Sequence, residues 1–282
     1  MFNQDELIRS FFKTSDYTVE KLNKGLTNDN YLITIDHQRF VLRVPRSDSA
    51  QIVNFIHEAK ALELAKQAGL DVNTLLYDEK TGIKLTQYVD DLLTFNEYHG
   101  QDKLNRTAKL MKRLHDLKTP IGYDFDPISR YLQYRSYVKN PLIEDERAHR
   151  IIEAVRGLSY TPTLCHNDWV PGNIGFSQHK DYLLDYEYAG DNDPFFDVMS
   201  FITENELSPS DRQAFLDAYF DHPLSLDDQA RLAVYEDFHN LLWCTWAVMM
   251  SESRRDQIYD RIAQDKLKAV SYTHLRAHET IA

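Results

Sequence analysis

HNDWVPGN, residues 166–173, is the stretch that decides both the fold and the chemistry expected of this chain. It contains Asp168 and Asn173, and Asp185 follows it after two short apolar segments. In phosphoryl-transfer enzymes one Asp accepts the proton of the attacking hydroxyl, an Asn a few residues later holds one Mg²⁺, and a second Asp holds another. The order and spacing therefore predict a kinase in which Asp168 is the catalytic base and Asn173 and Asp185 are metal ligands.

The segment between Asn173 and Asp185 predicts a hairpin. Residues 174–176 and 182–184 are apolar, and residues 177–181 between them are typical of a turn. Such a hairpin would place Asn173 and Asp185 side by side, as a reaction that depends on positioning and on charge neutralisation requires. The competing interpretation is that these polar residues only form turns, which is their usual place in a globular chain.

Two longer segments carry a resemblance to a known family: CHNDWVPGNIGF at 165–176 and LLDYEYAGDNDPFFDV at 183–198. They resemble the bacterial choline kinases, which belong with the choline/ethanolamine kinases and the aminoglycoside phosphotransferases and have a fold similar to that of protein kinases. The resemblance extends from about Asp16 to about Met250. It implies an α+β, two-lobed protein-kinase-like fold, with a small antiparallel-sheet N-lobe and a larger, mainly helical C-lobe.

The hydrophobic pattern of the first third of the chain agrees with a small lobe. Residues 31–45 and 75–89 each alternate around a polar turn, which predicts two hairpins. Apolar residues at helical spacing predict a helix at 52–66. We therefore assign residues 1–89 to an N-terminal nucleotide-binding lobe.

The larger lobe is expected at 90–270, with the polar start of this range crossing from one lobe to the other. Ser208 and Ser225 each precede an acidic residue by three positions, which predicts capped helix starts. The end of the chain, 271–282, has no convincing amphipathic pattern and resembles translated sequencing-adapter read-through. We expect it to be a non-native tail, the alternative being a natural polar terminus.

Composition limits the classes of function. The net charge of -12 opposes binding to nucleic acid or to an anionic membrane and suits a site that attracts a cation. The apolar stretch 241–250 is too short to span a bilayer, and no export signal is visible, so we expect no membrane insertion. Cys165 and Cys244 are expected to be reduced, buried thiols, which predicts a cytoplasmic protein. The oligomeric state cannot be read from these features.

The turn GLTNDN at 25–30 lies between two predicted strands, where a kinase covers the nucleotide phosphates. It is similar to the Gly-Leu-Thr-Asn turn of the choline kinases, which implies phosphate contacts from Asn28 and Asn30 and from backbone N–H groups. A plain hairpin turn is the alternative.

Further nucleotide-binding residues are expected on the strands and the helix of the small lobe. Arg43 stands where protein kinases place a Lys, as in the choline kinases, and Glu58 on the following helix is its expected partner. Gln87 and Val89 belong to the expected hinge, whose backbone would meet adenine. The alternative for Arg43 is an exposed side chain beside a solvated Glu.

The predicted helix at 226–250 carries Trp243 and Trp246 on one stripe, where we expect the two rings to stack. The pair resembles the wall that choline kinases present to the trimethylammonium group, and Trp faces are the best partners for such a cation. Burial in the core is the alternative. Glu187 is expected beside the metals, as one of the acceptor-binding residues. Negative charge near the acceptor is expected from Glu204 and is also offered by Glu206, Asp191 and Asp193.

These observations and the resemblance predict an enzyme that transfers the γ-phosphoryl group of ATP to the hydroxyl of choline, giving phosphocholine and ADP, with Mg²⁺ as cofactor. The motifs around Asp168 and Asp185 act on phosphate rather than on the acceptor, so ethanolamine, thiamine or an aminoglycoside remain alternatives. ATP and GTP are not distinguished. A different class, an inactive nucleotide-binding module, is opposed by the presence of Asp168, Asn173 and Asp185.

Overall fold

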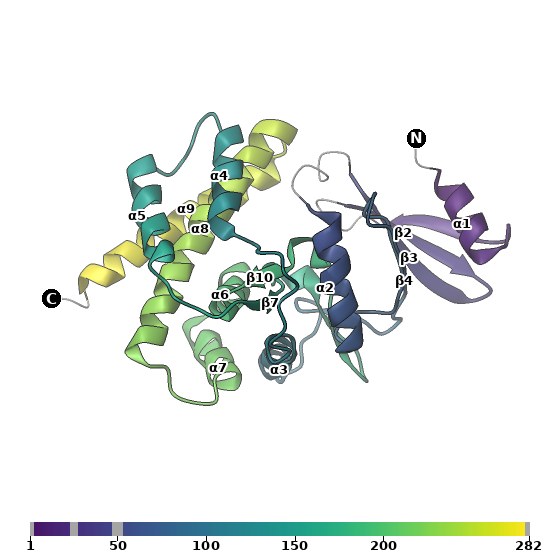
Figure 1. Ribbon diagram of the computed structural model, residues 1–282, viewed down its shortest axis with the longest axis horizontal. Helices are drawn as coiled ribbons and strands as arrows, with labels where there is room; N and C mark the ends of the chain where they lie inside the picture. The colour runs from purple at the N-terminus through teal and green to yellow at the C-terminus, as the bar shows by residue number, and fades with distance from the viewer. Residues whose placement is uncertain (1–2, 23–27, 47–52, 280–282) are drawn as a thin grey trace.

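The computed structural model describes residues 3–22, 28–46 and 53–279, with side chains as far as Val270. Two lobes lie side by side along the longest axis, and the two chain termini lie at opposite ends of the molecule (Figure 1). The smaller lobe contains an antiparallel sheet and the larger one is mainly helical. This arrangement confirms the predicted fold class, whereas the exact lobe boundaries remain predictions.

The small lobe is built on a five-stranded antiparallel sheet in the order β1-β2-β3-β5-β4. Its strands are β1 (Thr18–Leu22), β2 (Asn28–Ile35), β3 (Gln38–Pro45), β4 (Thr74–Tyr77) and β5 (Lys84–Gln87). Both predicted hairpins are present. Phe40 and Leu42 alternate onto the buried face of β3 and join Ile8 in the small apolar core. Ile8 belongs to α1 (Gln4–Phe12), a helix that the sequence analysis missed.

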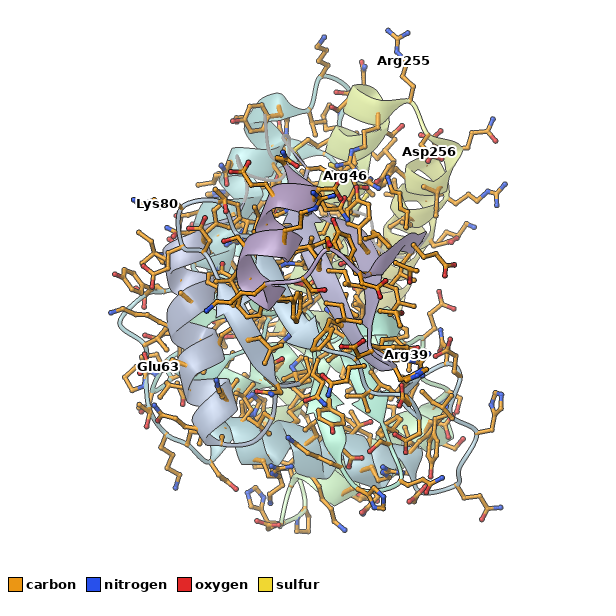
Figure 2. The ribbon with its side chains drawn as sticks, turned by 90° about the vertical axis from the view of Figure 1, so that its right-hand side faces the viewer. Arg39, Arg46, Glu63, Lys80, Arg255 and Asp256 are labelled. Carbon is orange, nitrogen blue, oxygen red and sulfur yellow. The ribbon has the colours of Figure 1, made fainter. Side chains whose placement is uncertain are left out.

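Helix α2 (Phe55–Gln67) lies between the sheet and the large lobe (Figure 1). Asn54 caps its N-terminus, because the Asn54 side chain accepts hydrogen bonds from two backbone N–H groups of the first turn. Its buried Leu62 belongs to the core of the large lobe. Glu63 lies on its outer side, away from Arg39 of β3, when the molecule is seen from the small-lobe end (Figure 2). The helix agrees with the prediction, although the expected first residue, Ile52, lies outside the described residues.

The large lobe is organised around one long central helix. Its helices are α3 (Lys103–His115), α4 (Pro127–Tyr137), α5 (Asp145–Arg156), α6 (Pro194–Glu204), α7 (Pro209–Tyr219), α8 (Leu226–Arg254) and α9 (Gln257–Glu279). Ser208 caps α7 and Ser225 forms a capping box with Asp228 at α8, as predicted. From Phe238 to Met250 every residue of α8 is buried, so this helix is the core on which α4, α5, α6 and α9 pack.

Two small sheets hold the motifs at the lobe boundary. They consist of β6 (Leu93–Thr94), β7 (Thr163–Cys165), β8 (Ile174–Phe176), β9 (Asp181–Leu183) and β10 (Gly190–Asn192). Strands β8 and β9 form the predicted hairpin, and β6, from the crossing segment, pairs with β8. Strand β10 pairs with β7. The loops after β7 and after β9 are thereby brought together.

The backbone of α9 continues through Ser271 as a helix to Glu279, although the sequence predicted no amphipathic pattern there. Extending an existing helix costs much less than starting one, so an amphipathic face is not needed for this continuation. Just before this extension, the carbonyl of Val270 accepts a hydrogen bond from Nη2 of Arg147 at 2.7 Å. Among the described residues, no helix is long and apolar enough to cross a membrane.

Candidate active site

Asp197 holds the loop that carries Asp168 through hydrogen bonds to its backbone. Asp197 of α6 accepts hydrogen bonds from the backbone N–H groups of His166 (2.8 Å) and Asn167 (2.7 Å) and pairs with Nε2 of His115 at 3.0 Å. Asn167 has a left-handed φ of 65°, which Asn tolerates better than most residues. Asp197 therefore braces the loop and does not line the cavity.

Asp168 itself is fixed by the amide of Asn173. The Nδ2 group of Asn173 donates to the backbone carbonyl and to Oδ2 of Asp168, both at 2.9 Å. Burial, and next the negative charges of Glu187, Glu204 and Asp185, raise the pKa of Asp168 well above its ordinary value. A carboxylate whose proton affinity is raised in this way is suited to accepting a proton from a hydroxyl group.

Asp185 meets the small lobe through Arg43. Nη1 of Arg43 lies 2.5 Å from Oδ1 of Asp185 and 2.7 Å from Oε1 of Glu58, while Nη2 donates to Oε2 of Glu58 at 2.7 Å. Arg43 and Glu58 are both buried, unlike the solvated pair of the alternative interpretation. Burial would raise the pKa of Asp185, but the positive charges of Arg43 and Lys84 outweigh it and lower that pKa.

The oxygen atoms of Asp185, Glu187 and Asn173 form the candidate metal site. Glu187 is buried, and burial together with the charge of Asp185 raises its pKa to about 8. A buried carboxylate and a half-buried one that repel each other in this way fit a site for a cation between them. Carboxylate and amide oxygens are also the ligands that Mg²⁺ prefers. The residues present therefore fit a magnesium ion.

One cavity of about 700 Å³ runs between the lobes and past Asp168. Of the predicted nucleotide residues, Asn30, Arg43, Gln87 and Val89 line it. Two do not: Glu58 lies behind Arg43, and Asn28 lies behind Glu187, to which its Nδ2 donates at 2.9 Å. Asn28 is thus placed to orient a candidate metal ligand. Residues 25–27 of the predicted phosphate turn lie outside the described residues.

The sequence analysis missed Lys84 of β5, a buried cation that lines the same cavity. Its Nζ lies 3.8 Å from Oε1 of Glu58, so two cations, Arg43 and Lys84, share this acid. A charged residue inside a predicted strand was the one available signal, and it points to solvent as often as to a site.

The far end of the cavity is lined by Trp243 and Trp246 of α8. Their ring centroids are 6.0 Å apart with an interplanar angle of 85°, so the rings meet edge to face, and the expected stacking is wrong. Edge-to-face contact is a preferred geometry because the positive ring edge meets the negative ring face. Both side chains are mostly buried yet border the cavity, so the core and wall interpretations both describe them.

His239 orients Trp243 one helical turn away. Nε1 of Trp243 donates to Nδ1 of His239 at 3.2 Å, and Nε2 of His239 lies 2.9 Å from the carbonyl of Phe196. A carbonyl can only accept and an indole N–H can only donate, so His239 is neutral with its proton on Nε2. Burial lowers the pKa of His239 to about 3, in agreement with that assignment.

The candidate acidic residues of the acceptor end separate into two groups. Glu204 and Glu206 line the cavity, and Glu204 forms an ion pair with Lys266 of α9 at 2.6 Å. The expectation for Asp191 and Asp193 is wrong. Asp191 accepts from three backbone N–H groups between Ile121 and Tyr123, and Asp193 pairs with Arg231, so both carboxylates are used inside the fold.

Two lobes, a cleft between them, and a loop Asp beside a candidate cation site rich in oxygen atoms are typical of the class of kinase-like phosphotransferases. A family model described as the phosphotransferase enzyme family matches residues 18–235. The chain belongs to this family. The match begins at β1 and ends within α8, so it covers Asp168, Asn173 and Asp185 but not Trp243 and Trp246.

Three similar proteins illustrate the relationship. Protein LicA of Haemophilus influenzae is 29% identical over 246 residues, which cover 81% of this chain and 72% of that protein. A thiamine kinase of Escherichia coli O157:H7 is 27% identical over 213 residues, with 72% of each chain covered. The crystal structure of choline kinase LicA from Streptococcus pneumoniae superimposes with a TM-score of 0.81, at 24% identity, over 95% of this chain and 98% of that one. The structural likeness shows a shared fold.

Proposed function

We propose that this enzyme is a choline kinase, which transfers the γ-phosphoryl group of ATP to the hydroxyl of choline with Mg²⁺ as cofactor, and that it acts in the cytoplasm. The observation that carries the proposal is that Trp243 and Trp246 line the same cavity as Asp168. The similar proteins named above, one of them described as a choline kinase, support it.

In this proposal the small lobe binds the nucleotide. The base would lie near Gln87 and Val89, and Asn30 and Arg43 would face the phosphates, since these four residues line the cavity. Glu58 and Asp185 fix the guanidinium of Arg43 at the cleft, and Lys84 lines the same cavity. Two cations held beside the cavity support the assignment of this end to the phosphates.

The transfer step is assigned to Asp168. Its carboxylate accepts the hydroxyl proton while the acceptor oxygen bonds to the γ-phosphorus, and the bond from that phosphorus to the bridging oxygen breaks to release ADP. Asn173 holds Asp168 in place and, with Asp185, would hold Mg²⁺, with Glu187 beside them. When bound, the metal supplies positive charge to the phosphate oxygens.

The acceptor end is assigned to the two indoles and to Glu204. A quaternary ammonium has no N–H to donate, so it is recognised by the negative faces of aromatic rings and by charge. Each indole face contributes about 0.5 to 2 kcal/mol to such a cation, depending on how far it is desolvated. Both rings are largely removed from water here, which favours the upper part of that range.

Thiamine is the second candidate acceptor, because thiamine kinases of Escherichia coli match 72% of this chain. Thiamine also carries a cationic nitrogen without a proton, so the same indole faces suit it. An inactive nucleotide-binding module is opposed by membership of an enzyme family and by the arrangement of Asp168 with Asn173.

The test is a measurement of ADP release with choline, ethanolamine, thiamine and kanamycin as separate acceptors, with Asp168→Ala as the control for background hydrolysis. We expect choline to give the highest kcat/KM and the variant to abolish the difference between acceptors. A higher kcat/KM with any other acceptor would overturn the choice of choline. Release that is insensitive to Asp168→Ala would overturn the assignment of the base.

A further inference from the structure

An ion pair at the acceptor end of the cavity joins Lys266, which lies outside the family-matched region, to Glu204, which lies inside it. Nζ of Lys266, on α9, lies 2.6 Å from Oε1 of Glu204 and 3.4 Å from the carbonyl of Thr203. The two side chains of the pair are only 13% and 16% exposed, so water screens it little. Both residues line the cavity together with Trp243 and Trp246.

The pair lies close enough to the reaction centre to affect it. Glu204 is the last residue of α6, and its charge is one of those that raise the pKa of Asp168. Lys266 neutralises this carboxylate at the place where a cationic acceptor has to sit. An unpaired Glu204 would attract a cation more strongly, so Lys266 must have another effect on the acceptor site.

Primary and quaternary ammonium groups differ in the number of hydrogen-bond donors that they offer. A primary ammonium carries three N–H donors and gains most from a carboxylate that can accept them, whereas a quaternary ammonium carries none. Lys266 occupies Oε1 of Glu204 and neutralises its charge, so the carboxylate attracts a second N–H donor less strongly than an unpaired one would. The other carboxylates at this end, Glu206 and Asp265, are exposed, and water competes for their hydrogen bonds.

We propose that Lys266 determines acceptor selectivity: by holding Glu204 in an ion pair, it weakens the hydrogen-bonding partner of a primary ammonium and leaves the indole faces to select a quaternary one. This inference rests on the proposed function, because it explains how the same site would prefer choline to ethanolamine. The contact with the Thr203 carbonyl also gives Lys266 a structural role at the C-terminal end of α6, which the test has to separate.

The test compares kcat/KM for choline with kcat/KM for ethanolamine in the wild type and in Lys266→Met, which keeps an unbranched apolar stem and removes the ammonium group. We expect the choline-to-ethanolamine ratio to fall about tenfold, the size of one hydrogen bond to a charged group. Taking the ratio cancels any effect of the freed Glu204 on Asp168, since both acceptors use the same base. Lys112→Met is the matched control, because Lys112 pairs with Asp221 and does not line the cavity.

The outcomes separate the two proposals. A wild type without choline activity defeats the proposed function, whatever the variants do. A wild type that prefers choline, with a ratio unchanged in Lys266→Met, defeats the inference alone, and so does an equal loss of both activities with a lower melting temperature. If Lys266→Met does not fold, Glu204→Gln serves instead. It leaves Lys266 as an unpaired cation, so the KM for choline should rise several-fold while that for ATP holds, and an unchanged KM for choline would overturn the inference.

Discussion

The two ends of the cleft, which we propose bind the nucleotide and the acceptor, differ in the chemistry of their side chains. The nucleotide end depends on buried charges, with Arg43 joined to Glu58 and Asp185 across the lobes. The proposed acceptor end is lined by the aromatic rings of Trp243 and Trp246 and by the ion pair of Lys266 with Glu204, whose side chains are 13% and 16% exposed.

The difference follows from the chemistry of the two ligands proposed for the site. A triphosphate offers many oxygen acceptors, so a fixed guanidinium fork recognises it well. A quaternary ammonium offers only a diffuse positive charge. Aromatic faces attract this charge, and no hydrogen-bond donor has to be removed from water. Changes at one end should then leave the Michaelis constant of the other ligand unchanged, whereas a change at the residue between the ends, the proposed catalytic base, should act on turnover.

Asp168 is that residue, and its loss should have the largest effect. We expect Asp168→Ala to lower kcat by about two to four orders of magnitude, because the general base is removed. Nucleotide binding should change little, since Arg43 and its partners are untouched. Single-turnover rates and a nucleotide titration would measure the two quantities. Turnover equal to that of the wild type would remove Asp168 from the chemistry.

Arg43→Lys tests the nucleotide end. An ammonium group keeps the charge but cannot reach Glu58 and Asp185 with a rigid fork, so we expect kcat/KM for ATP to fall about tenfold to a hundredfold, the range for lost hydrogen bonds to charged groups. The KM for choline should stay within a factor of about two of the wild type. An equal rise in both Michaelis constants would show that the two ends are coupled through Asp185.

Replacing Trp243 or Trp246 by Leu tests the acceptor end. Leu keeps apolar bulk but removes the π face, so the KM for choline should rise several-fold to about thirtyfold while the KM for ATP holds. If the rings act only as core, the variants should instead lower the melting temperature and harm both substrates alike.

The nucleotide end was more predictable from the sequence than the acceptor end, because its parts lie in regular elements close together in the chain. Alternation along β3 and the first turn of α2 place Arg43 opposite Glu58. The hairpin after Asn173 and the caps at Ser208 and Ser225 are equally local, and the structure shows all of them.

What the sequence could not provide depends on contacts between distant segments. The burial of Lys84 requires Glu58, and the partner of Glu204 comes from α9. Asp191 and Asp193 lie within the second motif, 183–198, but their backbone and Arg partners lie in other parts of the fold. Proximity in sequence to a catalytic motif therefore does not predict that a carboxylate faces the site.

A pH experiment tests how protonation of His239, at the acceptor end, affects the stability of the protein. The folded pKa of His239 is about 3, below the unfolded value of about 6.5. Its contribution to stability is therefore present in full above pH 6.5 and is lost as the pH falls towards 3. For the wild type we expect a loss of about 1 to 2 kcal/mol between pH 7 and pH 5 from this residue.

His239→Gln, which cannot be protonated, should reduce that loss, as measured by melting temperatures at several pH values. Titration of the buried His166 would remain in both proteins. The variant should also raise the KM for choline, since Trp243 loses its acceptor. An acid sensitivity identical to that of the wild type would show that His239 is not what limits the stability of the acceptor end.

The smallest effect is expected at the end of α9. We predict that deleting residues 271–282 leaves the activity and the melting temperature within error, because a segment without an amphipathic pattern should bury little apolar surface. The cut falls after Val270, so the hydrogen bond from Arg147 to its carbonyl and the pairing of Lys266 with Glu204 are kept. Melting curves and the Michaelis constants for both substrates would measure the effect. A selective rise in the KM for choline would mean that the segment supports α9 at the acceptor end, whereas a drop of several degrees in melting temperature with both constants unchanged would mean that it docks elsewhere on the large lobe.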